Sequence, residues 1–242
     1  MTGEYYVGVF RGRKTIQRRD SVGGARSVFV KLQGNKNELV YPTFGGFIKN
    51  PFKGAAKLFA GDLMEYRTDA NGVKPEIYML KTYLVVSVSG NTVNIARDPY
   101  KHVPFVGDKL GVAPETVGGD MTAAAVNKVA KTTVKVDGVD VDVWALTFGS
   151  ALGAEKGDVL VEAGEDNKML VKAINAVAHA DMDMLDAPAS EVEEDDDFDG
   201  ARYSYTPALG GIMYINKMSP LPDCVLALNQ AKVNGWYQIQ SV

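Results

Sequence analysis

Short runs of alternating apolar residues dominate the middle of the chain and predict paired β-strands. Residues 83–89 are apolar and β-branched, a turn follows at Gly90-Asn91, and residues 92–96 continue as a partner strand. A second hairpin is predicted where valines alternate on both sides of Asp137-Gly138, a dipeptide that a type I′ turn favours. Alanines and valines in residues 120–130 predict a short helix. The pattern as a whole favours a mainly β fold with one or two short helices.

A Gly-Asp dipeptide opens an apolar run three times, at Gly61-Asp62, Gly107-Asp108 and Gly157-Asp158. The spacings of 46 and 50 residues are too unequal for propeller blades, which need closer self-similarity. A turn of this kind is typical of the rim of a small β-barrel, where it reverses the chain before a strand. We therefore predict a compact β-barrel or β-sandwich body over residues 58–178 that uses one turn three times.

Residues 1–57 differ from this body in charge and in the spacing of their apolar residues. Residues 1–60 carry eleven Lys or Arg against three Asp or Glu, whereas the rest of the chain carries fifteen against twenty-seven. Their short apolar bursts bury too little to offset about 1–2 kcal/mol of backbone entropy per residue. We predict an extended basic arm that docks on a negative surface. The candidate docking residues are Arg11, Arg13, Lys14, Arg18, Arg19, Tyr41, Phe44 and Phe47.

Three kinds of surface would attract such an arm: nucleic acid, an acidic protein, or the chain's own acidic body. Basic residues with interleaved aromatic rings suit phosphate contacts as well as acidic protein surfaces. The net charge of the whole chain is −4. This acidic balance favours a protein partner over nucleic acid.

Residues 179–202 form an acidic stretch, with ten Asp or Glu and no Lys or Arg between residues 180 and 200. Like charge at this density is typical of a solvated, mobile loop. Asp195, Asp197 and Asp199 precede Gly200 with the spacing of the first half of a calcium-binding loop. Thr206 stands where such a loop has a bidentate Glu. The pattern therefore fits either a weak calcium site or a solvated loop without an ion.

Residues 203–242 predict a strand, a helix and a last strand. The expected ranges are 211–216, 223–232 and 236–242, with a Pro-rich turn before the helix. The sequence has no run of eighteen apolar residues, so no transmembrane helix is expected. The charged first twenty residues lack the apolar core of a signal peptide. No membrane association is expected.

Standard catalytic motifs are absent from the sequence. It contains no GxxxxGK[ST], GxGxxG, HExxH, GxSxG or CxxC pattern. His102 and His179 have no nucleophile motif beside them, and a hydrogen-bonded or exposed His fits them better than a general base. Cys224, beside Val225 and Leu226, has the surroundings of a small buried apolar residue more than those of a nucleophile. We expect no catalytic residues, no enzyme activity, and no cofactor apart from the calcium alternative.

Three segments resemble the head decoration and head-fibre proteins of tailed bacteriophages: residues 81–96 (KTYLVVSVSGNTVNIA), 102–112 (HVPFVGDKLGV) and 146–163 (LTFGSALGAEKGDVLVEA). In those proteins a Gly-Asp phrase closes a hairpin of the β domain. The resemblance extends over about residues 58–175. It implies a structural virion protein that is made in the host cytoplasm and binds the outer surface of the capsid. It also implies the major capsid protein as partner, self-association into trimers or clusters, and no catalysis.

Two other functions fit the same sequence. A head-fibre anchor or host-surface-binding module would still be structural, although a trimeric spike would show long repetitive strands or heptads, which are not visible here. A hydrolase that uses Asp or Glu would need a structured, partly desolvated pocket. Co-elution with capsids separates the structural alternatives from the enzyme.

Overall fold

The computed structural model describes residues 42–48, 56–68, 71–72, 75–98, 101–184, 204–214, 218–230 and 237–240. The chain is mainly β, as the sequence predicts. Its described strands and helix are, in chain order, β1 (Gly46–Ile48), β2 (Ala56–Leu58), β3 (Leu63–Thr68), β4 (Pro75–Leu80), β5 (Thr82–Ser89), β6 (Thr92–Ala96), β7 (Lys109–Val112), β8 (Ala123–Val136), β9 (Val139–Phe148), β10 (Val159–Glu162), β11 (Ala176–Val177), β12 (Met182–Met184), β13 (Ser204–Tyr205), β14 (Gly211–Tyr214), α1 (Asp223–Gln230) and β15 (Tyr237–Gln240).

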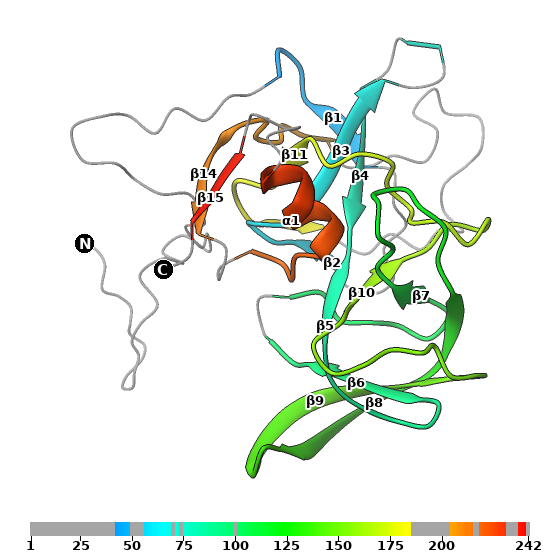
Figure 1. Cartoon of the computed structure of the whole chain (residues 1–242). Helices are drawn as coiled ribbons and strands as arrows, with labels where there is room; N and C mark the ends of the chain where they lie inside the picture. Colours follow the sequence, from blue (N-terminus) through cyan, green and yellow to red (C-terminus); the bar gives the residue numbers. More distant parts are fainter. Residues whose placement is uncertain are drawn as a thin grey trace, which may run out of the picture.

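Six strands between residues 82 and 162 pair in a closed ring and form a β-barrel (Figure 1). The ring order is β10-β5-β6-β9-β8-β7, and each neighbouring pair is antiparallel. Both predicted hairpins lie in this ring. Asp137 and Gly138 have φ angles of 51° and 87°, the two positive values that a type I′ turn needs. The interior is filled mainly by apolar side chains, among them Tyr83, Val85, Ile95, Leu110, Leu146, Phe148 and Leu160.

The helix predicted over residues 120–130 is wrong, because most of these residues belong to strand β8. Ala124 pairs with Leu110 and Ala123 pairs with Gly111. A Cβ on Gly111 would lie 2.3 Å from the carbonyl oxygen of Thr122, so the two strands approach closely only because residue 111 is glycine. Relative to other ordinary residues, alanine stabilises a helix by less than about 1 kcal/mol per residue. Pairing with β7 and the long ladder with β9 outweigh that preference.

A second sheet lies above the barrel in Figure 1, with strand order β11-β3-β4-β1-β13. Its strands precede the barrel in the sequence (β1, β3, β4) or follow it (β11, β13). The pairs are antiparallel except β1 with β4. β4 ends at Leu80 and β5 begins at Thr82, so one extended run passes from the sheet into the barrel with Lys81 between them. This run connects the two halves of the molecule.

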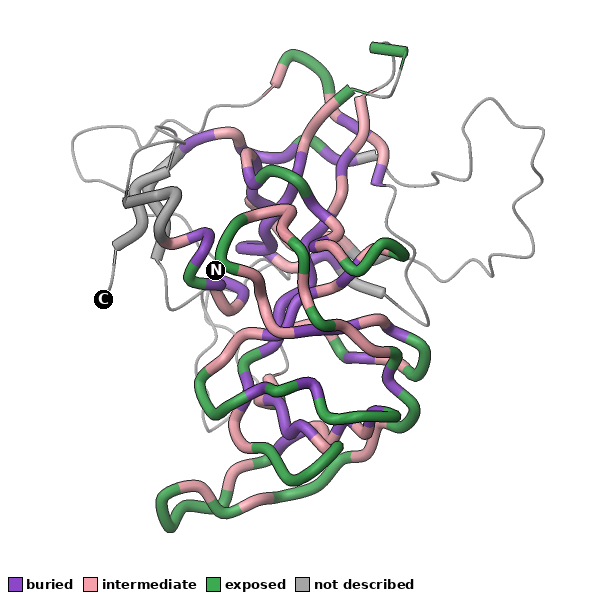
Figure 2. Tube along the Cα trace, turned by 45° about the vertical axis from the view of Figure 1, so that its right-hand side comes forward, coloured by how far each residue is buried: buried purple, intermediate pink, exposed green. Residues whose placement is uncertain are grey.

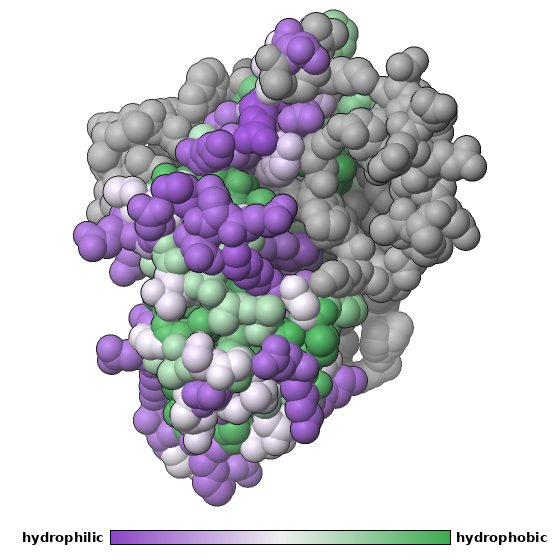
Figure 3. All heavy atoms as spheres, turned by 90° about the vertical axis from the view of Figure 1, so that its right-hand side faces the viewer, coloured by the Kyte–Doolittle hydropathy of each residue, from purple (hydrophilic) through white to green (hydrophobic). Residues whose placement is uncertain are grey.

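Buried residues continue across the boundary between the sheet and the barrel. One apolar cluster combines Leu63 and Leu80 of the sheet with Val161 of the barrel and with Val225 of α1. Figure 2 shows this central region as mostly buried and the tip of the β8–β9 hairpin as mostly exposed. Figure 3, a view from the right-hand side of Figure 1, shows hydrophilic residues gathered over the upper part and hydrophobic residues between hydrophilic ones lower down. The sheet, the barrel and α1 thus share one core region.

The structure places elements inside two segments that the sequence assigns to an arm and a loop. β1 lies within residues 1–57, pairs with β4 and β13, and contains the buried residue Ile48. β12 lies within residues 179–202 and pairs with β2. The five-stranded sheet therefore reaches into residues 1–57, and a separate two-stranded sheet, β12-β2, reaches into residues 179–202. The last part of the chain forms a strand, a helix and a strand as expected, and β14 pairs with β15 in parallel.

Candidate functional site

All three Gly-Asp dipeptides close the same turn. Gly61, Gly107 and Gly157 have φ angles of 95°, 93° and 100°, which glycine adopts without the strain that a Cβ brings. In each turn the Asp amide donates to the carbonyl three residues earlier, over 3.0–3.2 Å. The Asp carboxylate accepts a bond from the amide of that same earlier residue, over 2.7–2.8 Å. The repeat in the sequence is therefore one structural device used three times.

Each turn also holds one distant residue through a pair of backbone hydrogen bonds, which we call a Gly-Asp clamp. The Gly amide donates to the carbonyl of that residue, and the Asp carbonyl accepts from its amide, over 2.8–3.0 Å in all six bonds. The held residues are Ala178, Val126 and Val85 in turn, and all three are buried. The first clamp lies in the sheet half of the molecule, and the other two fasten segments of the barrel.

The first clamp differs from the others because its carboxylate is completely buried. Asp62 Oδ2 lies 2.8 Å from His102 Nε2, and the Ser219 hydroxyl donates to Asp62 Oδ1 over 2.6 Å. Burial raises the pKa of the Asp62 carboxyl. The charge of His102 and the hydrogen bonds from His102, Ser219 and Phe59 together outweigh burial, so this pKa lies below its ordinary value. The buried carboxylate joins three segments that are far apart in the sequence.

A second buried ion pair lies where β5 begins and β10 ends. Lys81 Nζ is 3.1 Å from Glu162 Oε1, and the two side chains are 9% and 12% exposed. Burial raises the pKa of Glu162, and the charge of Asp108 adds to this while Lys81 and His102 oppose it. The other Glu162 oxygen and the Tyr83 hydroxyl are buried and have no hydrogen-bond partner among the described residues. Burial, and then the charges of Asp108, Glu162 and Asp62, raises the pKa of Tyr83 well above its ordinary value.

These interacting groups form what we call the junction cluster. Its members come from the sheet, the barrel and the segment before α1, and they are Asp62, Lys81, Tyr83, His102, Asp108, Glu162 and Ser219. The sequence analysis did not find this cluster. His102 and the Gly-Asp aspartates stood out in the sequence separately, and no pattern indicated that they meet each other or Lys81 and Glu162.

Ser219, His102 and Asp62 are the residue types of a nucleophilic triad, but they are connected in a different order. In a triad the His lies between the Ser and the Asp and takes the Ser proton. Here Asp62 lies between the other two, and the Ser219 hydroxyl donates a hydrogen bond to the carboxylate. Among the residues that the structure describes, no group of three or more His, Cys, Asp or Glu is placed to hold a metal ion. The arrangement fastens segments together.

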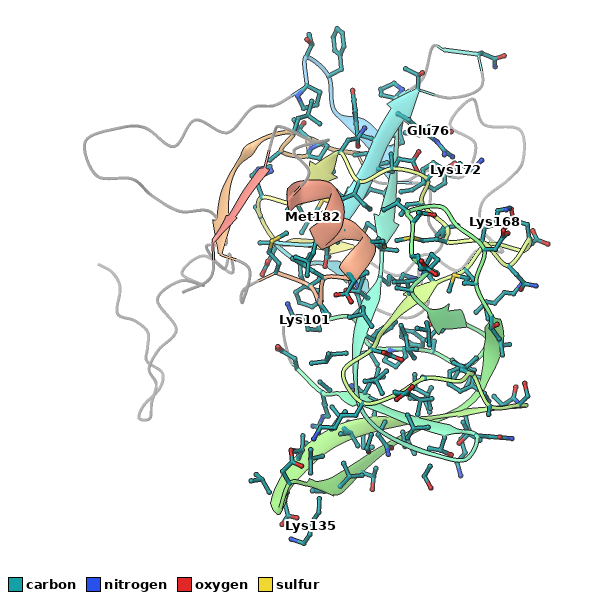
Figure 4. The ribbon with its side chains drawn as sticks, viewed as in Figure 1. Glu76, Lys101, Lys135, Lys168, Lys172 and Met182 are labelled. Atoms are coloured by element: carbon teal, nitrogen blue, oxygen red, sulfur yellow. The ribbon has the colours of Figure 1, made fainter. Side chains whose placement is uncertain are left out.

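An open cleft of about 580 Å³ lies beside the junction cluster and shares Tyr83 and Ser219 with it. Barrel residues form one wall, and the Pro-rich segment before α1 forms the other. Leu84, which lines the cleft, is 40% exposed. Lys101 also lines it, below α1 in Figure 4, and its ammonium donates to the Met218 carbonyl. The acidic lining residues are Asp98, Glu115, Asp158 and Asp223.

Two of the predicted docking residues lie in the described part of the chain. Phe44 is 73% exposed, and its carbonyl accepts a bond from the Tyr66 hydroxyl over 3.0 Å. Phe47 is half-buried within β1, in register with Glu76 and Ser204. Outside the described residues lie Arg11, Arg13, Lys14, Arg18, Arg19 and Tyr41, together with the calcium candidates Asp195, Asp197 and Asp199.

His179 and Cys224 have structural surroundings, in line with the sequence analysis. The amides of His179 and Ala180 donate to the Tyr205 hydroxyl over 3.0 Å each, and burial lowers the pKa of His179. Cys224 is 4% exposed, and burial raises the pKa of its thiol. Neither residue belongs to the junction cluster.

In comparisons with known proteins, no family model matches the chain, and neither a curated protein nor a solved structure matches it. Within the described residues, no helix has the length and the apolar character needed to cross a membrane.

Proposed function

We propose that this chain is a non-enzymatic structural protein of a tailed-bacteriophage virion that binds the outer surface of the capsid, with the major capsid protein as its partner. The observation that carries the proposal is the set of hydrogen-bond partners of the buried Asp62 carboxylate. Its carboxylate is fully buried and bound to His102, Ser219 and the Phe59 amide, so it fastens the molecule instead of facing a substrate. The resemblance of residues 58–175 to head decoration proteins supports the same function.

A protein that strengthens a shell must keep its shape while it holds the edges of neighbouring subunits. Three Gly-Asp clamps and the junction cluster supply that rigidity within this chain. Exposed apolar side chains supply anchors: Phe44 beside β1 and Val139 in the β8–β9 hairpin are 73% and 63% exposed. The core of a stable protein interface is apolar and contains aromatic anchors. These features support a binding role for the body.

The direct test is sedimentation of the full-length chain with phage heads that lack it. Saturable binding to intact shells, and much weaker binding to dissociated capsid subunits, are expected for a footprint that spans subunits. Phe44→Ser should weaken binding, whereas Val88→Ser, at another exposed apolar position, serves as the control. Failure of the wild-type chain to bind any shell, or equal affinity for shells and subunits, would contradict the proposal.

The β8–β9 hairpin favours one second candidate, a fibre anchor or host-surface-binding module. Val134 pairs with Val141 and Val136 with Val139, so four valines lie on one face of this ribbon. Lys135 lies at its tip in Figure 4. In this alternative, Val136→Ser with Val139→Ser leaves binding to shells intact and abolishes adsorption of complete virions to host cells. Loss of shell binding in the same variant would place the hairpin in the capsid contact instead.

A further inference from the structure

The barrel wall of the cleft is an apolar strip on the outside of the ring. Leu84 pairs with Val159, and Thr82 pairs with Val161. Since paired and alternate residues share a face, these side chains lie on one side, while Tyr83 packs into the barrel. β5 has a partner strand on both sides, yet Leu84 is 40% exposed. A segment that docks in the cleft would cover this apolar strip.

Among the residues that the structure describes, the charged side chains that line the cleft have one dominant sign. Asp98, Glu115, Asp158 and Asp223 contribute four carboxylates and Lys101 one ammonium, which leaves a balance of −3. The ammonium of Lys101 is held at the Met218 carbonyl. A concave surface lined by one sign of charge attracts ligands of the other sign. The cleft therefore suits a cationic ligand that also carries apolar groups.

Residues 4–14 of the chain, EYYVGVFRGRK, have the matching chemistry. Tyr5, Tyr6 and Phe10 provide rings for an apolar strip, and Arg11, Arg13 and Lys14 follow them directly. We propose that the cleft is a docking groove for residues 4–14 of the same molecule, with the rings against Leu84 and Val159 and the basic side chains at the acidic rim. A covalently linked segment has an effective concentration of about millimolar, so it outcompetes the same segment of a neighbouring molecule in dilute solution.

Such docking would give the free protein a built-in control over its basic segment. While residues 4–14 occupy the cleft, their charges are satisfied by the chain's own carboxylates, and other acidic surfaces must compete for them. The inference does not require capsid binding. It can fail while sedimentation with shells succeeds, and the reverse also holds, so the two proposals are tested separately.

The test uses a fluorescent peptide of residues 4–14 and the full-length chain. In the variant with Arg11→Gln, Arg13→Gln and Lys14→Gln, the linked segment no longer competes with the labelled peptide for the cleft. The labelled peptide should therefore bind this variant about tenfold or more tightly than it binds the wild-type chain. Fluorescence anisotropy measures both affinities, and added salt should weaken the complex because rim charges contribute to it. No gain in affinity in the variant would overturn the proposal.

Two matched pairs of substitutions in the same background locate the peptide. Leu84→Ser should weaken binding at least about fivefold, whereas Val88→Ser, on the same strand with 39% exposure, should not. Glu115→Gln should weaken binding and Glu165→Gln should not, because both glutamates are exposed and only Glu115 lines the cleft. Equal effects within either pair would overturn the assignment. Circular dichroism melts confirm that each variant is folded.

Cross-linking of the unsubstituted segment distinguishes its own cleft from that of a neighbour. A photoreactive residue in place of Phe10 should form links to the cleft wall within a single molecule when light and heavy-isotope proteins are mixed at low concentration. Links that join light to heavy chains would overturn the intramolecular assignment and place the segment on a second copy. Links to surfaces away from residues 84, 113, 159 and 221 would overturn the groove itself.

Discussion

The turns at Gly61-Asp62 and Gly157-Asp158 have the same backbone conformation and differ in the surroundings of the Asp carboxylate. Both have a positive φ at Gly, the same carboxylate-to-amide bond and the same two-bond clamp. Asp62 is fully buried and has His102 and Ser219 as further partners, whereas the hydrogen bond of Asp158 to the Glu155 amide is solvent-exposed. The shape of the turn is therefore a property of the local sequence, and its energetic weight depends on burial.

Replacement of the two aspartates by alanine should show the largest difference. Asp62→Ala leaves the His102 ring and the Ser219 hydroxyl buried without their common acceptor, and the loss of one partner of a buried charged pair costs about 3–5 kcal/mol. Asp158→Ala removes one exposed bond, which is worth about 0.5–1.5 kcal/mol. Urea unfolding measures both. Similar losses in the two variants would mean that burial adds nothing to the first turn.

Two buried hydroxyls near the junction should respond in opposite directions. Ser219→Ala removes a bond to a carboxylate, and hydrogen bonds to charged groups contribute about 1.5–3 kcal/mol. Tyr83→Phe removes a buried hydroxyl that has no partner in the described part of the chain, so stability should stay the same or rise. Thermal unfolding of both variants provides the measurement. A clear loss in Tyr83→Phe would show that this hydroxyl has a partner in solution.

Gly157→Ala tests the backbone of the turn without any steric clash. A Cβ at this position meets nothing within 4 Å, so the cost comes from the φ of 100° alone. Strain of this kind amounts to about 1–3 kcal/mol. Chemical denaturation should show a loss in that range, with the native circular dichroism spectrum retained. An unchanged stability would indicate that the turn relaxes to another conformation.

The pH dependence of stability separates the two buried carboxyls, because their pKa values move in opposite directions on folding. The pKa of Asp62 is lowered from 3.8, so its contribution is present above 3.8 and is lost as the pH falls through the lowered value. The pKa of Glu162 is raised from 4.5, so its contribution is present below 4.5 and is lost as the pH rises through the raised value. Unfolding at a series of pH values should show both changes. Asp62→Asn should remove only the first change, and Glu162→Gln only the second.

Local features of this fold were predictable from the sequence. Alternating valines around Asp137-Gly138 and the three Gly-Asp steps depend on neighbouring residues alone, and the structure contains both as expected. The failed helix at residues 120–130 shows the limit of such reasoning. The alanines there form a strand because Gly111 lets β7 approach them, which is a contact between segments.

The junction cluster was not predictable for a related reason. Asp62 binds His102 at a separation of 40 residues and Ser219 at a separation of 157 residues. Each of these residues is ordinary by itself in the sequence. They come together only because the sheet, the barrel and the segment before α1 pack against one another. The other predicted docking residues and the calcium residues fall outside the described residues, and the docking role of Phe44 and Phe47 also stays a prediction.

The order of strands has a consequence for the way the chain folds during synthesis. The barrel uses residues 82–162 only, whereas the sheet needs β3 and β4 from before the barrel and β11 from after it. Contacts between segments that are close in sequence form faster than distant ones. The barrel therefore closes while β3 and β4 still wait for β11, and Asp62 meets Ser219 last. Pulse-labelled hydrogen exchange should show amides of β6 and β9 protected before those of β11, which makes the barrel the template on which the sheet is completed.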